Sequence, residues 1–464
     1  MTKLPDPARS NAQFEKDRRH VLHPFAAFPD FLETGSRFFE SAQGVHVKGS
    51  DGRDYLDGIG GLWCVNIGYG RQEMADVMAQ QALQLPYYNT FGDMSSAPAA
   101  DLAEKVAELA PGDLNHVFFT TGGSMSVDTA VRLAHFYFQA QGRPSKRKII
   151  ARENGYHGST YLTASITGIK RNHKGFHTLN SGPDPLVHYV SCPNLYRPID
   201  GLEEGPFCDA LMAELESTIA EIGAENIACF IAEPIIGAGG VIVAPEGYHK
   251  RALEICRAHD ILYISDEVVT AFGRLGHIFA SEPKFEIVPD IIICAKGISS
   301  GYIPLGATIF SDKIHEGISQ PKSGSGVFSH GFTYSGHPVA CAVGLKNIEI
   351  MEREDICAHA AKVGATFQAR LASLSDLKLV GDVRGDGLMA GVELVQDKAS
   401  KTPFDPAVAI TKRVAKAAYQ KGLVVRAAGD VMVMSPPLII SEEQVEELVE
   451  TLKASLHSVA EGMS

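Results

Sequence analysis

Three apolar runs along the chain each end in an ionisable side chain, and they follow one another at intervals of about thirty residues. They are ACFIAEP, which carries Glu233, ILYISDE, which carries Asp266, and IIICAKG, which carries Lys296. The interval is the length of one strand–helix–strand unit, and runs without apolar–polar alternation are typical of strands buried on both faces of a parallel sheet. Ligands of such sheets bind outside the carboxyl ends of the strands. We therefore expect the two acids and the lysine to meet in a candidate active site at this edge.

Lys296 and Asp266 each admit a structural and a chemical interpretation. A lysine at a strand end could reach solvent or pair with a carboxylate, or a pocket could lower the pKa of its amine so that it attacks a carbonyl group. The aspartate could form a plain ion pair, or it could hold the protonated ring nitrogen of a heteroaromatic cofactor. The two residue types together favour pyridoxal phosphate (PLP), with Val268 packing on the face of the ring.

A turn that binds phosphate is expected where a glycine-rich segment opens a helix. Residues 117–129, VFFTTGGSMSVDT, have this form: Gly122 and Gly123 let backbone N–H groups approach an anion, and Ser124 offers a hydroxyl at the positive end of the helix. An ordinary strand–helix turn is the alternative. Tyr156 and His157 follow the next strand in a loop, where an aromatic ring could stack on a flat cofactor or simply cap the core.

The composition is that of a globular protein and disfavours several classes of function. The 464 residues are 45% hydrophobic and 21% charged, with a net charge of −13, which argues against nucleic acid or an anionic membrane as the main partner. The chain starts with a polar segment, and no run approaches the roughly 18 apolar residues of a membrane-spanning helix. The eight cysteines are scattered without a CxxC pair, which predicts reduced thiols, no metal site and a cytoplasmic location.

The pattern along the chain predicts two domains. Residues 1 to about 35 are expected to be irregular because of their prolines, and residues 37–58 to form an antiparallel hairpin. Strands and helices alternate from about 70 to 335, and antiparallel strands with helices follow. We expect an N-terminal segment (1–70) that joins the small domain, a large domain (71–335) and a C-terminal small domain (336–464). The predicted strands of the large domain are 114–119, 146–152, 227–234, 261–267, 290–297 and 304–310, and its helices are 72–85, 101–110, 127–140 and 247–260.

Five segments together resemble the motifs of class III aminotransferases, which belong to PLP fold type I. They are GLWCVNIGYGR, ENGYHGST, SDEVVTAFGRLG, IICAKGISSGYIPLGA and HGFTYSGHPVA, and the resemblance extends from about residue 22 to 440. It implies an α/β fold like that of aspartate aminotransferase, in which a large domain with a mostly parallel central sheet is joined to a small α+β domain. It also implies that Lys296 forms the internal aldimine with PLP and that Asp266 partners the pyridine nitrogen.

The same resemblance implies the other contacts of the cofactor. Tyr156 and Val268 enclose the ring, Gly123 and Ser124 bind the phosphate, and His157 and Glu233 lie beside the cofactor. Thr333 reaches the phosphate of the neighbouring subunit, so the site is expected to require a homodimer or a dimer of dimers.

Within the family the chain is most similar to ω-transaminases of the amine:pyruvate and putrescine:pyruvate types. The similarity lies in the segments LHPF, GLWCVN, YNTF and RAAGD. It implies that Arg426 grips the carboxylate of the keto acid and swings aside for an apolar amine, and that the amine pocket is lined by Phe25, Trp63, Phe91 and Tyr156. Relatives that act on ornithine or γ-aminobutyrate carry Glu and Arg where this chain has Ala238 and Val433, which disfavours those two substrates.

The expected reaction is a ping-pong transamination that passes through the Lys296 aldimine. A primary amine, diamine or ω-amino acid gives its amino group to pyruvate, which yields an aldehyde or ketone and alanine. One alternative is another PLP enzyme of the same fold, such as an aminomutase, racemase or decarboxylase, and dependence on a keto acid separates it from a transaminase. The other is a nucleotide-binding protein without PLP, although no GxGxxG or GxxxxGK[ST] motif follows a strand.

Overall fold

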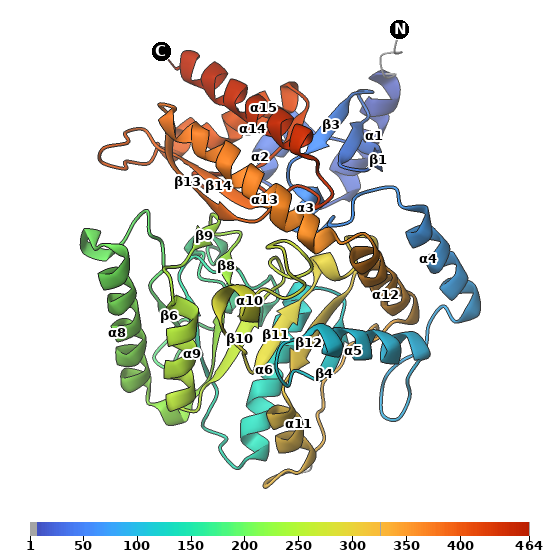
Figure 1. Cartoon of the computed structure of the whole chain (residues 1–464), viewed down its shortest axis with the longest axis vertical. Coiled ribbons are helices and arrows are strands. Elements are labelled where there is room, and N and C mark those ends of the chain that lie inside the picture. The colour runs from blue at the N-terminus through green and yellow to red at the C-terminus, as the bar shows by residue number, and fades with distance from the viewer. Residues whose placement is uncertain (1–6, 325, 464) are drawn as a thin grey trace.

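The computed structural model describes residues 7–324 and 326–463, and a seven-stranded sheet forms its centre (Figure 1). The strand order is β4-β12-β11-β10-β7-β5-β6. Only β12 runs antiparallel to its neighbours, and the other strands of this sheet are parallel. The predicted α/β fold with a mostly parallel central sheet is therefore confirmed. The strands are β4 (His116–Thr120), β5 (Lys148–Arg152), β6 (Val187–Val190), β7 (Ile227–Ala232), β10 (Leu262–Asp266), β11 (Ile291–Cys294) and β12 (Gly306–Phe310).

Helices cover both faces of this sheet, which explains its continuous apolar runs. Helix α6 (Gly123–Ala140) packs on one face, where Leu262 and Ile264 of β10 join its apolar cluster. Tyr263 points to the other face and packs with α8 (Glu204–Ile222) and α9 (Tyr248–Ala258). By the same alternation Asp266 is directed to the α6 side of the sheet. Helices α5 (Ala97–Leu109) and α12 (Pro338–Arg353) cover the β4, β12 and β11 part of the face opposite α6.

Two smaller sheets lie beyond the carboxyl ends of the central strands, at the end of the molecule that carries α1 (Pro7–His20) and α15 (Glu442–Glu461) (Figure 1). One is antiparallel, with the order β13-β14-β17-β16, and the other has the order β1-β2-β3-β15. Strand β3 pairs in parallel with β15, so strands from the two ends of the chain share one sheet. The domain boundaries at residues 70 and 335 remain a prediction. The strands are β1 (Phe39–Gln43), β2 (His46–Gly49), β3 (Asp54–Asp57), β13 (Val380–Asp386), β14 (Met389–Leu394), β15 (Leu423–Val424), β16 (Arg426–Ala428) and β17 (Val431–Met434).

The prediction that the first 35 residues are irregular is wrong for the part that the structure describes. Helices α1 (Pro7–His20) and α2 (Phe28–Thr34) occupy most of it. Pro7 is the first residue of α1, and Pro29 lies in the first turn of α2. A proline fits there because the N–H that it lacks has no partner within the first helical turn. The prolines therefore mark helix starts, whereas residues 1–6 lie outside the described part.

The remaining elements connect these layers, and β6 and α8 are two elements that the sequence pattern did not predict. In residues 7–324 and 326–463, no helix has both the length and the apolar character that crossing a membrane requires. The further helices are α3 (Gly60–Trp63), α4 (Gln72–Gln84), α7 (Tyr161–Ile166), α10 (Ser281–Phe285), α11 (Asp312–Ser319), α13 (Ile356–Ala372), α14 (Ile410–Gln420) and α15 (Glu442–Glu461), and a two-stranded sheet joins β8 (Ile235–Ile236) to β9 (Ile242–Val243).

Candidate active site

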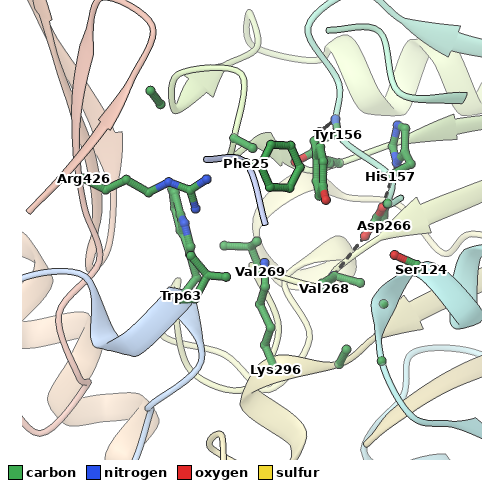
Figure 2. Close-up of a pocket in the computed structure, with 18 of the residues that line it drawn as sticks. Phe25, Trp63, Ser124, Tyr156, His157, Asp266, Val268, Val269, Lys296 and Arg426 are labelled. Carbon is green, nitrogen blue, oxygen red and sulfur yellow. Dashed lines mark hydrogen bonds and ion pairs between the residues drawn. The ribbon is translucent and has the colours of Figure 1, made fainter. Parts of the chain in front are cut away.

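A cavity of about 800 Å³ opens at the carboxyl ends of β7, β10 and β11. It receives side chains from the central sheet, from the start of α6 and from the C-terminal sheet (Figure 2). Eleven of the residues predicted for the site line it: Phe25, Trp63, Gly123, Ser124, Tyr156, His157, Glu233, Asp266, Val268, Lys296 and Arg426.

The register of the parallel strands brings the three ionisable residues together. Ser265 of β10 is level with Ala232 of β7, and Asp266 is level with Ile293 of β11. Glu233 directly follows β7, so it lies beside Asp266 at the same edge. Lys296 comes two residues after the end of β11 and opens a 3₁₀ turn, η4 (Lys296–Ile298). The convergence expected from the spacing of the apolar runs is present.

Lys296 is partly buried, and its side chain extends into the cavity (Figure 2). Among the described residues no hydrogen bond or ion pair holds its ammonium group. Burial lowers the pKa of Lys296 to about 8, although the nearby carboxylate of Asp266 opposes this shift. An amine with this pKa is available as a base or nucleophile near neutral pH, which favours the chemical interpretation of this lysine.

Asp266 is buried, and it is held by His157 rather than by the lysine. The Nδ1 atom of His157 lies 2.7 Å from Oδ2 of Asp266, and the backbone N–H of Val268 donates to Oδ1 over 3.2 Å. An ionised carboxylate only accepts hydrogen bonds, so Nδ1 is the donor. The other ring nitrogen of His157 is buried and has no hydrogen-bond partner among the described residues. The pair thus fixes a carboxylate at the cavity wall.

Glu233 organises the loop that carries the aromatic residue of the site. Its carboxylate accepts the backbone N–H groups of Tyr156 over 2.9 Å and Gly237 over 2.8 Å. Burial raises the pKa of Glu233. The role of this acid in the structure is therefore to hold backbone, which places the Tyr156 ring over the cavity (Figure 2).

The N-terminus of α6 faces the same cavity without a side-chain cap. Gly122 precedes the helix, and a Cβ atom added there would meet nothing within 4 Å. The hydroxyl of Ser124 accepts the backbone N–H of Ser159 over 3.1 Å. A Cβ atom at Gly158 would lie 2.5 Å from the Ser124 hydroxyl, so the loop approaches the helix as closely as only glycine permits. Free N–H groups at a helix start suit a phosphate.

These features fit the cofactor that the sequence implies. The start of α6 can bind an anionic group, and Asp266 can accept a hydrogen bond from a protonated ring nitrogen. The second ring nitrogen of His157 is buried and has no hydrogen-bond partner among the described residues, so a cofactor could supply one. Val268 and Tyr156 also line the cavity, where their side chains can enclose a flat ring. Among the described residues, no group of three or more His, Cys, Asp or Glu side chains could hold a metal ion.

Phe25, Trp63 and Arg426 also line the cavity. Arg426 belongs to β16 of the C-terminal sheet, and Trp63 closes the short helix α3. Figure 2 shows Arg426 and Trp63 on one side of Lys296, with His157 and Asp266 on the other. Burial and the nearby Arg171 lower the pKa of Arg426, while Tyr156 raises it. A guanidinium thus faces the lysine across the space available to a substrate.

Phe91 and Thr333 do not line the cavity of the single chain. Their two segments lie side by side on the surface. The hydroxyl of Tyr87 donates to the carbonyl of Thr333 over 2.7 Å, and the ring of Phe91 lies against Gly331. Half of the Phe91 surface is exposed. The structure therefore leaves these two predicted site residues apart from the other eleven.

Several residues that line the cavity were not predicted from the sequence, and Val269 and Arg171 are two of them. Val269 directly follows Val268, and its position is decided by how the chain turns after β10. Arg171 lies in the cationic segment IKRNHK, which carries no recognisable motif. No sequence pattern marks either residue as part of the site. Both lie in loops, where the path of the backbone decides which side chains reach the cavity.

The sequence as a whole matches the family Aminotransferase class-III over residues 33–456. The chain therefore belongs to the class III aminotransferases, enzymes of PLP fold type I that depend on PLP, as its fold and cavity led us to expect. Putrescine–pyruvate aminotransferase of Pseudomonas aeruginosa is 41% identical to it over 445 residues, which cover 96% of this chain and 95% of the relative.

Two solved structures are similarly close. An (S)-enantioselective ω-transaminase from Thermomicrobium roseum is 41% identical to this chain, with a TM-score of 0.92. The match covers 97% of this chain and 98% of the T. roseum chain. The ω-transaminase of Pseudomonas jessenii in complex with PMP has a TM-score of 0.93 at 40% identity, with coverage of 97% and 98%. The predicted family, fold, enzyme class and cofactor are confirmed.

Proposed function

We propose that this aminotransferase is an ω-transaminase that transfers an amino group from a primary amine, diamine or ω-amino acid to pyruvate. The observation that carries the proposal is the cavity in which Arg426 faces Lys296 and Asp266. A guanidinium suits the carboxylate of a keto acid, and Phe25, Trp63 and Tyr156 offer an apolar wall to an amine. The names of the similar proteins from P. aeruginosa, T. roseum and P. jessenii support the same class of reaction.

Each residue has a role in this proposal. When bound, PLP supplies an aldehyde that takes up the amino group and a ring that withdraws electrons. Asp266 keeps a proton on the ring nitrogen, and His157 orients Asp266 through their 2.7 Å hydrogen bond. Gly123 and Ser124 hold the phosphate at the start of α6. Lys296, whose free amine has a pKa of about 8, would take a proton from the carbon of the amine donor in the first half-reaction and would give a proton to the carbon of the keto acid in the second.

We also propose that the active form is a homodimer or a dimer of dimers. Phe91 and Thr333 lie away from the cavity on a surface that exposes Tyr87, Tyr88 and Tyr334. Exposed aromatic clusters are typical of protein interfaces, and a second copy could bring these residues to the neighbouring site. The cytoplasmic location belongs to the same proposal, and all eight cysteines are free thiols in the structure.

The test is an initial-rate study in which an amine and pyruvate are both varied and alanine is measured. Parallel reciprocal plots are expected for a ping-pong mechanism, whereas intersecting plots would contradict it. Conversion of the amine without any keto acid would favour an aminomutase or racemase. Replacing Arg426 by Ala should raise the KM of pyruvate far more than that of a monoamine that has no carboxylate. Equal increases in the two KM values would argue against the proposed binding of the keto-acid carboxylate by Arg426.

A further inference from the structure

Arg171 is a second guanidinium at the mouth of the active-site cavity. It lies in the 3₁₀ turn η1 (Lys170–Asn172), its side chain is exposed, and it lines the same cavity as Arg426. One of its terminal nitrogens lies 3.8 Å from the position that a Cβ atom of Gly429 would take, next to the strand that bears Arg426. Two guanidinium groups from different parts of the fold thus approach one opening, and Lys412 is a further cation in the lining of this cavity.

The turn that presents Arg171 is anchored. Ile169 is buried, the backbone N–H of Asn154 donates to the carbonyl of Gly168 over 3.1 Å, and the ring of His173 lies 2.6 Å from the carbonyl of Thr167. Among the described residues, Arg171 itself makes no hydrogen bond and no ion pair. Its guanidinium is therefore held near the cavity while its donors remain available.

The acidic residues of the cavity are already committed elsewhere. Among the described residues that line it, the acids are Asp266, which binds His157, and Glu233, which binds two backbone N–H groups. Both are buried, whereas Arg171 is at the opening. A second ammonium group on a substrate would thus meet the guanidinium groups of Arg171 and Arg426 at this end, where the described lining of the cavity offers no free carboxylate. Asp430, whose pKa is raised by burial and lowered by the charge of Arg171, lies outside this lining.

Building on the proposed transaminase function, we propose that Arg171 is an anion-binding residue that shares the distal carboxylate of an ω-amino acid with Arg426, so that the enzyme prefers ω-amino acids to diamines. A guanidinium binds a carboxylate through two parallel hydrogen bonds. Two such groups at one opening select a negative charge and repel the far ammonium of a diamine. Pyruvate needs only Arg426, because its carboxylate is attached to the reacting carbon.

The test compares donors that differ only in the charge at their far end. 3-Aminopropanoate, 1-aminopropane and 1,3-diaminopropane form one series, and 5-aminopentanoate, 1-aminopentane and 1,5-diaminopentane form a second that covers a longer reach. We expect Arg171→Glu to lower kcat/KM about 10-fold for the amino acid of the preferred length and to raise kcat/KM for the diamine of the same length. The value for the monoamine, which has no charge at its far end, should change little. Arg171→Lys should retain most of the preference.

The neighbouring Lys170 provides the control. It is 83% exposed, pairs with Glu153 over 2.8 Å and does not line the cavity. Lys170→Glu makes the same change of charge one residue away, and it should leave the ratio of amino acid to diamine unchanged. If Arg171→Glu also leaves this ratio unchanged, or lowers all three donors alike, the inference is overturned.

A binding measurement separates this inference from the proposed function. Trp63 is the only tryptophan of the chain and lines the cavity, so its fluorescence reports occupancy without turnover. Pentanoate has no amino group and cannot be a donor, and its affinity should fall about 10-fold in Arg171→Glu but not in Lys170→Glu. If no donor yields alanine while pentanoate binding depends on Arg171, the transaminase proposal fails and the anion site stands. Equal pentanoate affinity in all variants overturns the anion site.

Discussion

At the scale of single residues, the site contains backbone conformations that a sequence alone does not favour. Phe25, Trp63 and Lys296 have φ angles of 55°, 64° and 46°, in the left-handed region that costs non-glycine residues free energy. All three line the cavity. Such residues persist only where the surrounding packing determines them, and here that packing aims an amine and two aromatic rings into one space.

Lys296 should make the cofactor-free protein less stable than a variant without the charge. Its pKa is about 8 in the folded chain and 10.5 in an exposed lysine. Between these values the unfolded chain binds more protons, so stability rises with pH across this window, and below pH 8 the folded state bears the full cost of a buried ammonium. We expect Lys296→Met to stabilise the apoprotein by up to about 3 kcal/mol at pH 7.

Urea unfolding of both apoproteins at pH 7 and at pH 10.5 measures this effect. The difference between Lys296→Met and the wild type should shrink as the pH rises, because the lysine is then increasingly neutral in both states. A difference of the same size at both pH values would show that the methionine acts through packing and not through the missing charge.

At the scale of elements, the start of α6 and the loop after β5 depend on each other. Gly158 has a φ of 132°, and an added Cβ would lie 2.5 Å from the hydroxyls of both Ser124 and Thr163. Gly158→Ala should therefore displace Ser124 and the loop that carries His157. We expect the affinity for PLP to fall about 10-fold or more, since the proposed phosphate site loses a preorganised donor. Titration of the apoprotein with PLP measures this change.

Gly142, beyond the other end of α6, supplies the matched control. It also has a positive φ, 76°, but nothing lies within 4 Å of an added Cβ. Gly142→Ala should cost about 1 kcal/mol of stability through the strained backbone and should leave PLP affinity unchanged. Equal PLP affinity in the two variants would mean that the close approach at Gly158 does not shape the cofactor site.

At the scale of the whole molecule, a buried charge network ties the C-terminal sheet to the central part. Glu393 of β14 accepts from the Nε of Arg197 over 2.9 Å and from Nη1 of Arg384 over 2.7 Å. Arg384 also donates to the carbonyls of Gly240 and Val241, which lie beyond the end of β7. The Glu393 side chain is only 6% exposed, so its removal leaves two arginines without their shared partner.

Glu393→Ala should therefore destabilise the protein by about 3 kcal/mol. The exposed pair of Asp209 and Arg251 is the comparison, because its side chains are 71% and 40% exposed, and Asp209→Ala should cost less than about 1 kcal/mol. Urea unfolding of both variants gives the two values. A loss for Glu393→Ala no larger than that for Asp209→Ala would show that the network does not hold the two parts together.

Much of the central sheet and of the site floor could be predicted because local pattern and register decide them. Apolar runs marked β7, β10 and β11, and parallel pairing brought the residues at their ends to one edge. The prolines of the first 35 residues misled the prediction, since Pro7 and Pro29 begin helices instead of preventing them. A proline can mark either an irregular segment or the start of a helix, and the packing of the neighbouring residues decides which of the two forms.

The sequence by itself predicted that Asp266 and Lys296, at the ends of neighbouring strands, would share a site, but it did not predict what holds Asp266 or where the neighbouring Glu267 lies. The tertiary structure decided these contacts: Asp266 faces His157 and the cavity, whereas Glu267 is buried and accepts the backbone N–H groups of Ala280 and Ser281. It also brought Arg171 to the cavity and left Phe91 and Thr333 outside it. These positions depend on contacts between loops that are far apart in the sequence. Such contacts leave no periodic pattern in the sequence, so they could not be inferred from it.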